Sequence, residues 1–464
     1  MKLKMKNINK IYWVCLCLIT LSACHKAELA IISAPVRLVS NGITSDTLKG
    51  AVRGTMLAGK TYYFKTDITV NEGDTLQMQE GVKLIAIGDG KTYQTAPEII
   101  MHGTFISLGT KEKPNYITVQ NADTYHTEAL AQNYTDVFKG WWGGIVCWPD
   151  PSSKNPAPGG DLIIKWTHLE LAGGPASGNE TGVYASGDPR YIIYFGNITK
   201  KFILEDSWVF GAKDDAIRVS GGKISIMRNT FELCGQLGGE FFNMKSGTVG
   251  DLAYNFFIGA ATNALKASDA GSSGTQTNVA MYNNTMVNCG FRQTKSGRGG
   301  SINFEKAARG MVYNNLIANC RFGLRLTSDA DLTNIKYNNQ YFYGSTQKIV
   351  DLFQAADGVS TFQSADIHST TPKENDPTFY GYDLTAFDYT ANPGPMTVSV
   401  QTPAAVLVGT SNFRLKAGSK GVNAGNVNFS PIASVTATGD YGTTITLPGK
   451  DIGAYQSDGT GNQH

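Results

Sequence analysis

The sequence predicts an all-β protein that folds as a right-handed parallel β-helix (a solenoid) with a C-terminal capping region. The first observation is a repeated phrase, because "NNTMVNCG" at 283–290 and "NNLIANCR" at 314–321 are near copies. The second is its recurrence at uneven intervals of 23 to 31 residues, which is typical of stacked coils whose loops differ in length. The third is strand-like alternation without a helical period in each repeat. The aligned positions are Asp206, Asn229, Asn255, Asn284, Asn315 and Asn339.

Fixed side-chain sizes at fixed offsets indicate that each coil stacks on the next. The residue two positions after the aligned one is always bulky: Trp208, Phe231, Phe257, Met286, Ile317 and Tyr341. The residue five positions after it is always small or a thiol: Gly211, Cys234, Ala260, Cys289, Cys320 and Gly344. We therefore expect a ladder of side-chain amides at the Asn positions, hydrogen-bonded from coil to coil. We also expect the cysteines of the coils to be small buried thiols.

The N-terminal segment, residues 1–23, is expected to be a lipoprotein signal peptide. Four Lys residues precede an apolar run at 11–21 that is too short to span a bilayer as a permanent helix. "LSAC" at 21–24 resembles a bacterial lipobox, which makes Cys24 the lipidated first residue of the mature chain. His25 in place of Asp after the Cys is similar to outer-membrane sorting, so we expect an outer-membrane, lipid-anchored protein at the cell surface. The alternative is an ordinary signal peptide with an incidental Cys.

The rest of the chain divides into three segments. Residues 24–50 are interpreted as a tether and lead-in, residues 51–345 as the parallel β-helix, and residues 346–464 as an irregular, β-rich capping tail that closes the open end of the solenoid. The 52 Gly residues and the aromatic content of 10% are typical of turn-rich β structure. A net charge of +2 gives no basis for nucleic-acid binding.

Both ends of the mature chain resemble a known group of proteins. The stretch "GKTYYFKTDITVNEGDTLQMQEGVKLIA", the later "GWWGGIV" and the tail motif "KDIGAYQ" resemble parallel β-helix lipoproteins of Bacteroidetes type, in the pectate-lyase-like superfamily. The resemblance implies the fold and leaves the activity open, because that superfamily holds pectate-lyase-like enzymes, glycoside hydrolases and proteins without known catalysis. "KDDAIRVSGG" at 213–222 is similar to the Asp-Asp turn of polygalacturonase-type β-helices. The Asn-Thr-Asp, Gly-His-Gly and Arg-Ile-Lys motifs of those enzymes are absent.

A second strand in each coil presents a candidate binding surface. Alternation predicts one outward column formed by Arg218, Asn243, Lys266, Asn303 and Arg325, and a second formed by Ser220, Lys245, Ser268, Glu305 and Thr327. Together these columns predict a polar, mostly cationic strip roughly 19 Å long. Such a strip suits a polysaccharide with acidic groups. The substrate-binding candidates are Arg218, Asn243, Lys266, Asn303, Glu305 and Arg325. The alternative is a plain solvated face.

Carboxylates at the edge of this strip suggest two catalytic alternatives. For a polysaccharide lyase, Asp214, Asp215 and Glu240 are suited to hold Ca²⁺, with Lys245 or Lys266 as the base. For a glycoside hydrolase, Asp215 and Glu240 on adjacent coils approach the separation of about 5 Å that a retaining enzyme needs.

Three functions therefore stay open. The favoured one is binding, or helping to process, extracellular polysaccharide without catalysis and without a cofactor, in association with a TonB-dependent transporter system. The second is catalysis as a polysaccharide lyase or glycoside hydrolase. The third is a structural or adhesive role at the cell surface.

Overall fold

The computed structural model describes residues 41–130, 134–178, 183–293, 295, 297–386, 412–437 and 441–464. All of them belong to one compact unit, Val39–His464. The predicted signal peptide and the lipidation site at Cys24 lie outside the described residues. Among the described residues, no helix is both long enough and apolar enough to cross a bilayer.

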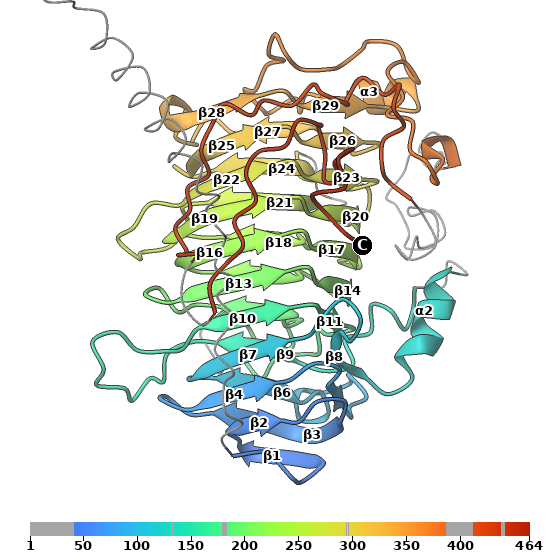
Figure 1. Ribbon diagram of the computed structural model, residues 1–464. Coiled ribbons are helices and arrows are strands. Elements are labelled where there is room, and N and C mark those ends of the chain that lie inside the picture. The colour runs from blue at the N-terminus through green and yellow to red at the C-terminus, as the bar shows by residue number, and fades with distance from the viewer. Residues whose placement is uncertain are drawn as a thin grey trace, which may run out of the picture. The chain divides into compact units, whose positions relative to one another are not determined.

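The predicted parallel β-helix is confirmed. The described residues form a 10-stranded sheet and a 19-stranded sheet, and the chain alternates between them coil after coil with parallel pairing throughout (Figure 1). The 10-stranded sheet is called the first ladder. Its strands are β2 (Gly54–Met56), β4 (Thr75–Met78), β7 (Thr104–Leu108), β10 (Leu162–Lys165), β13 (Lys201–Glu205), β16 (Gly222–Met227), β19 (Thr248–Ala253), β22 (Asn278–Tyr282), β25 (Arg309–Tyr313) and β28 (Ile335–Asn338).

The 19-stranded sheet contains two ladders that share β3, because Thr61–Phe64 of that strand pair with β5 and Ile68–Val70 pair with β6. The second ladder consists of β1 (Thr47–Ala51), β3 (Thr61–Val70), β5 (Lys83–Ala86), β8 (Asn115–Val119), β11 (Thr167–Glu170), β14 (Trp208–Ala212), β17 (Thr230–Cys234), β20 (Phe256–Ala260), β23 (Thr285–Val287), β26 (Leu316–Ala318) and β29 (Tyr341–Tyr343). The third ladder continues from β3 through β6 (Glu98–Met101), β9 (Gly144–Cys147), β12 (Ile193–Phe195), β15 (Ile217–Val219), β18 (Phe242–Met244), β21 (Asn263–Ser268), β24 (Gly300–Glu305) and β27 (Leu324–Leu326).

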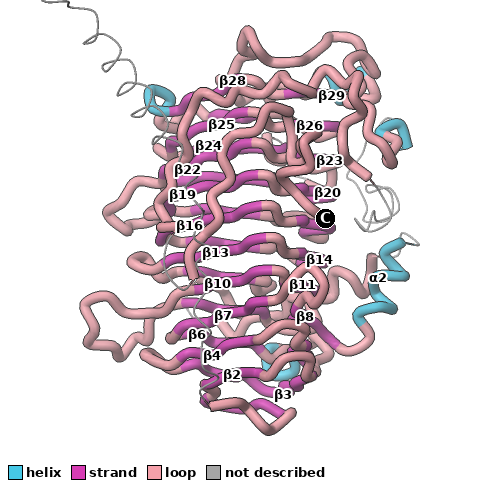
Figure 2. The backbone as a smooth tube through the Cα atoms, viewed as in Figure 1, coloured by secondary structure: helices cyan, strands magenta, loops and turns pink. Residues whose placement is uncertain are grey.

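Helical segments are few and short in the described chain, which is mostly strand and loop (Figure 2). They are η1 (Tyr93–Thr95), α2 (Ala122–Leu130), η2 (Leu332–Asn334), α3 (Gln347–Val350) and η3 (Leu384–Ala386). The inward side chains of all three ladders meet in one apolar core. In the third ladder the core column is Ile217, Phe242, Leu265, Ile302 and Leu324. Burial of each such side chain contributes roughly 1.5–3 kcal/mol, so the stack of coils is held mainly by this core.

The predicted amide ladder is confirmed at its four central positions. The backbone and side-chain N–H groups of Asn229 both donate to Oδ1 of Asn255 at 3.0 Å. The same pair of bonds joins Asn255 to Asn284 at 3.0 and 3.1 Å, and Asn284 to Asn315 at 3.1 and 2.9 Å. All four residues are fully buried. The ladder therefore satisfies the polar groups of the turn between the first and second ladders.

At its two ends the predicted alignment is wrong by one residue. Gln340, not Asn339, accepts from Asn315, and Ser207, not Asp206, donates to Asn229. Asp206 and Asn339 instead have φ values of 50° and 56°, in the left-handed turn conformation. The turn residues that directly precede the central ladder positions share this conformation: Arg228, Tyr254, Asn283 and Asn314. Asn is tolerated both at the ladder position and at the left-handed turn position before it, so a pattern of Asn residues does not distinguish the two positions.

The predicted size columns shift by the same one residue at those ends. Val209 and Phe342, rather than Trp208 and Tyr341, align with the bulky column. Ala212 rather than Gly211 aligns with Cys234. The four cysteines in the described part of the chain are buried and unpaired, as expected.

The C-terminal tail both covers the last coil and returns along the first ladder. Phe353 and Phe362, which follow α3, pack on Phe342 of β29 and cap that end. The tail then crosses the first ladder, where Asp251 of β19 accepts from the backbone of Ile432 and Ala433 at 2.8 and 2.7 Å (Figure 1). The described tail residues form isolated bridges rather than strands.

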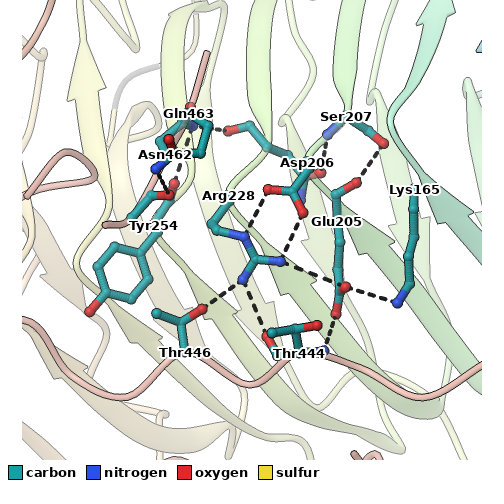
Figure 3. Close-up of polar contacts among 12 residues, drawn as sticks. Lys165, Glu205, Asp206, Ser207, Arg228, Tyr254, Thr444, Thr446, Asn462 and Gln463 are labelled. Carbon is teal, nitrogen blue, oxygen red and sulfur yellow. Dashed lines mark hydrogen bonds and ion pairs between the residues drawn. The ribbon is translucent and has the colours of Figure 1, made fainter. Parts of the chain in front are cut away.

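A charged cluster fastens this returning segment to the first ladder (Figure 3). Arg228 donates to both carboxylate oxygens of Asp206 at 2.8 and 2.9 Å. Its remaining nitrogen donates to Thr446 Oγ1 at 2.6 Å and to the Thr444 carbonyl at 3.2 Å. The Thr444 backbone N–H donates to Glu205, which is 1% exposed.

Replacement of Arg228 by Met is expected to destabilise the protein by about 3–5 kcal/mol, because it leaves the buried Asp206 without its cation, while Glu205 keeps Lys165. Amides of the tail near Thr444 and Thr446 should exchange with solvent faster than those of the core strands. Chemical unfolding and hydrogen exchange measure both effects. Lys223→Met, which removes an exposed cation from neighbouring β16, is the control and should change stability by less than about 0.5 kcal/mol.

Candidate functional site

The third ladder carries the predicted binding column on its outer side. Strand pairing places Arg218, Asn243, Lys266, Asn303 and Arg325 directly beside one another in successive coils. The other two ladders are covered along much of their length: the returning tail lies on the first, and Phe413 and Tyr455 of the tail pack on Phe256 of the second. Among the described residues, the contact of the tail segment with this column is made by Asp357, at Arg325.

The cations of this column are paired with carboxylates. Arg218 Nη2 lies 2.7 Å from Asp215 Oδ2, and Arg325 Nη2 lies 2.5 Å from Asp357 Oδ2. Lys266 Nζ lies 3.2 Å from Glu305 and 3.6 Å from Glu240. The strip is therefore not the mostly cationic surface that the sequence pattern suggested. That pattern did not count Asp357, which is distant in sequence, and it placed Asp215 and Glu240 at the edge of the strip rather than against its cations.

Asn243 and Asn303 are almost fully buried and orient their neighbours. Asn243 Nδ2 donates to Asp215 at 2.8 Å and to Glu240 at 3.3 Å. Asn303 accepts from Arg325 at 2.6 Å and donates to Glu305 at 3.2 Å. The two amides thus hold the charged groups in place. The partly exposed side chains of the column are those of Arg218, Lys266 and Arg325.

Asp215 and Glu240 form a buried carboxyl pair whose two members differ in protonation. Asp215 accepts from Arg218 and from the Glu240 backbone N–H at 2.8 Å, and although burial opposes ionisation, these donors hold the pKa of Asp215 below its usual range. Burial, together with the charge of Asp215, raises the pKa of Glu240 to about 8. At neutral pH the pair therefore consists of an ionised Asp215 and a protonated Glu240, which is the division of roles seen where one carboxyl acts as an acid.

Asp214, half-buried beside this pair, does not complete a calcium site. Burial and the charge of Asp215 raise the pKa of Asp214 to about 7, which opposes its use as an ionised ligand. Both oxygens of Asp215 already accept hydrogen bonds from N–H groups. In the described parts of the chain, no three His, Cys, Asp or Glu side chains converge as metal ligands. The donor set of Asp214, Asp215 and Glu240 therefore does not fit Ca²⁺.

A pocket of about 580 Å³ opens beside the column, next to Arg218 and Lys245. Its hydroxyl side is formed by Ser220, Ser246 and Ser273, and its apolar end by Val183, Tyr194 and Ile198. Lys245 is the one cation of the strip with no carboxylate within ion-pair distance among the described residues. Burial and the neighbouring charges of Lys266 and Arg218 lower the pKa of Lys245. An anion in the pocket would relieve this electrostatic penalty.

The pocket is built by a loop and by a strand of the third ladder, and the sequence analysis missed both. The loop at 270–273 approaches β18 closely enough for Ser246 Oγ and Ser273 Oγ to lie 3.0 Å apart. Gly271 permits this approach, because its φ is +138° and a Cβ there would lie 2.9 Å from the Ser246 Cβ. Tyr194 pairs with Arg218 one coil earlier, so extending the predicted column by one coil would have found it.

No family model and no curated protein matches this chain. The parallel strand pairings themselves establish the β-helix architecture.

Proposed function

We propose that this chain is an outer-membrane, cell-surface lipoprotein that binds extracellular polysaccharide on the third ladder, with an acidic group of the glycan in the pocket at Lys245. The observation that carries the proposal is the ammonium group of Lys245, which has no ion-pair partner among the described residues and lies in a pocket of about 580 Å³ on a face that the tail leaves largely uncovered. Pockets of roughly 300–1,000 Å³ are the usual size for small-ligand sites. A carbohydrate segment meets hydroxyl groups along one wall and apolar side chains at one end.

The proposed lipid anchor, the location at the cell surface and the transporter partner rest on the sequence motifs alone. Lipidation at Cys24 anchors the chain, and the tether at 24–50 spaces the solenoid from the membrane. Membership of the pectate-lyase-like superfamily, in a Bacteroidetes-type lipoprotein, is proposed from the resemblance of both ends of the mature chain. A TonB-dependent transporter system is the partner that such a surface glycan binder serves.

Replacement of Lys245 by Met is expected to weaken binding of acidic polysaccharide at least tenfold, because it removes the uncompensated cation of the pocket. Affinity gel electrophoresis with acidic and neutral polysaccharides measures the loss. Lys223→Met is the matched control, since it removes the same charge from an exposed site on the first ladder. Equal retardation of the Lys245 variant and the native protein would contradict the proposal.

The second candidate function is polysaccharide cleavage by a lyase or glycoside hydrolase mechanism. The opposite protonation states of Asp215 and Glu240 favour it, because a carboxyl group that is protonated at neutral pH can act as a general acid. Lys245 suits the base of a lyase better than Lys266, whose ammonium group is held between Glu240 and Glu305. New unsaturated or reducing ends, lost in Glu240→Gln, would establish catalysis. Failure of every glycan to bind would leave a structural or adhesive role.

A further inference from the structure

The pocket differs chemically from one end to the other. Val183, Tyr194 and Ile198 form the apolar end, and Ile198 is 47% exposed although it is a large hydrophobic residue. Lys245 and the serine hydroxyls form the polar end. Tyr194 and Lys245 belong to coils two steps apart, so the two ends are separated by about 10 Å along the solenoid axis. That distance is comparable with the length of a disaccharide.

The charge balance of the site limits how many acidic groups the ligand presents. Arg218, Lys266 and Arg325 each have a carboxylate partner at 2.5–3.2 Å, so they do not require an external anion. A second ligand carboxylate, placed one sugar away from Lys245 toward Tyr194, would meet only Arg218, whose charge Asp215 already balances, and would lose water against the apolar side chains without gaining an unpaired cation. Burial of an unpaired charge is strongly unfavourable.

From these two observations we infer that the ligand is a sparsely charged polysaccharide in which an acidic sugar neighbours an uncharged one, rather than a polymer with an acid on every residue. The acidic group lies at Lys245, and the less polar face of the neighbouring sugar lies against Tyr194 and Ile198. This inference rests on the proposed function, because it specifies the substrate class of the same pocket.

Titration of the full chain with three probes tests the inference. Hyaluronan alternates acidic and neutral sugars, polygalacturonate is acidic at every residue, and dextran is neutral. We expect hyaluronan to bind at least fivefold more tightly than polygalacturonate per sugar residue. The plot of log affinity against log salt concentration should have a shallow slope of about −1 or less steep, as for screening of a single ion pair. Equal or tighter binding of polygalacturonate, or a slope of about −3 or steeper, would overturn the inference.

Two variants separate the ends of the pocket. Lys245→Met should abolish the salt dependence of binding. Ile198→Ser should weaken hyaluronan binding about fivefold and leave the salt slope unchanged. Leu447→Ser is the control, since Leu447 is an exposed hydrophobic residue, 70% accessible, in the tail. An unchanged affinity in Ile198→Ser overturns the two-ended pocket.

The failure of the inference and the failure of the proposed function give different results. Binding of none of the three probes, with the fold intact by circular dichroism, contradicts both. Binding of dextran as tight as that of hyaluronan contradicts the acidic subsite and leaves glycan binding in place. Preference for polygalacturonate keeps the proposed function and overturns only the sparse-charge inference.

Discussion

Replacement of Asp215 by Asn is expected to lower the free energy of unfolding by about 3–5 kcal/mol, whereas Glu240→Gln, on the adjacent coil, is expected to raise it at pH 7. Asp215 is 2% exposed and ionised, so its loss leaves the guanidinium group of Arg218 without a partner in a largely buried site. Glu240 is 8% exposed and protonated, and Gln keeps the neutral shape of that carboxyl group.

The gain from Glu240→Gln follows from proton linkage. The pKa of Glu240 is about 8 in the folded protein, against its ordinary value of 4.5 in the unfolded chain. Between pH 4.5 and 8 the folded state binds more protons than the unfolded state, so stability falls as pH rises through this window. Gln does not titrate, and at pH 7 the substitution should therefore stabilise the protein by about 3 kcal/mol.

Chemical unfolding of the native protein and both variants at pH 5, 7 and 9 measures these effects. The increase in the free energy of unfolding caused by Glu240→Gln should be smallest at pH 5 and should grow toward pH 8. Asp215 has the opposite effect on stability, because folding lowers its pKa. Its contribution to the free energy of unfolding is present above its ordinary pKa of 3.8 and is lost as the pH falls further. A destabilising Glu240→Gln at pH 7 would show that the pair is not divided as described.

Replacement of Asn284 by Ala should lower the free energy of unfolding by about 3–5 kcal/mol, and Asn339→Ala by about 1 kcal/mol. Asn284 is fully buried; its Oδ1 accepts two hydrogen bonds from Asn255, and its Nδ2 donates to Leu252 and Asn315. Its removal leaves polar groups of two neighbouring coils unsatisfied in the core. Asn339 donates to the Ala424 carbonyl at 3.1 Å, and Ala at its φ of 56° adds modest backbone strain.

The two Asn variants form a matched pair because the repeated motif assigns them to equivalent positions. Thermal and chemical unfolding of both measures the difference, and a similar loss in the two would contradict the placement of Gln340 in the ladder. Hydrogen exchange shows where the effect lies. Asn284→Ala should reduce the protection of backbone amides on β23, which follows its turn, and on β20 and β26, the neighbouring strands of the second ladder.

The fold could be predicted because its main signal is local and repeated. Each coil has its own copy of the Asn position and of the alternating strand, which is why Ile217, Phe242 and their counterparts lie in one inward column. The alignment was wrong at the two ends, where Ser207 and Gln340 replace Asn. The sequences "DS" at 206–207 and "NNQ" at 338–340 do not show which residue adopts the left-handed turn conformation.

The site could be predicted only in part. The outward column from Arg218 to Arg325 was correct, because alternation determines which side chains share a face. The mostly cationic character predicted for that face was wrong, because Asp357, from a segment beyond the repeats, pairs with Arg325. The pocket was missed as well, because Val183, Ile198 and the loop at 270–273 lie outside the repeating strands, and no pattern places them beside Lys245.

By itself, the sequence determined the parallel stacking of coils, the amide ladder and the residues that face outward on the third ladder, because these depend on spacing along the chain. Only the tertiary structure decided that the tail covers the first ladder and that three of the four cations of the strip are neutralised. It also decided that Lys245 lies in a pocket without an ion-pair partner among the residues that the structure describes. The physical reason is that strand alternation acts over a few residues, whereas ion pairing and burial depend on groups that lie far apart in the chain and meet only after folding.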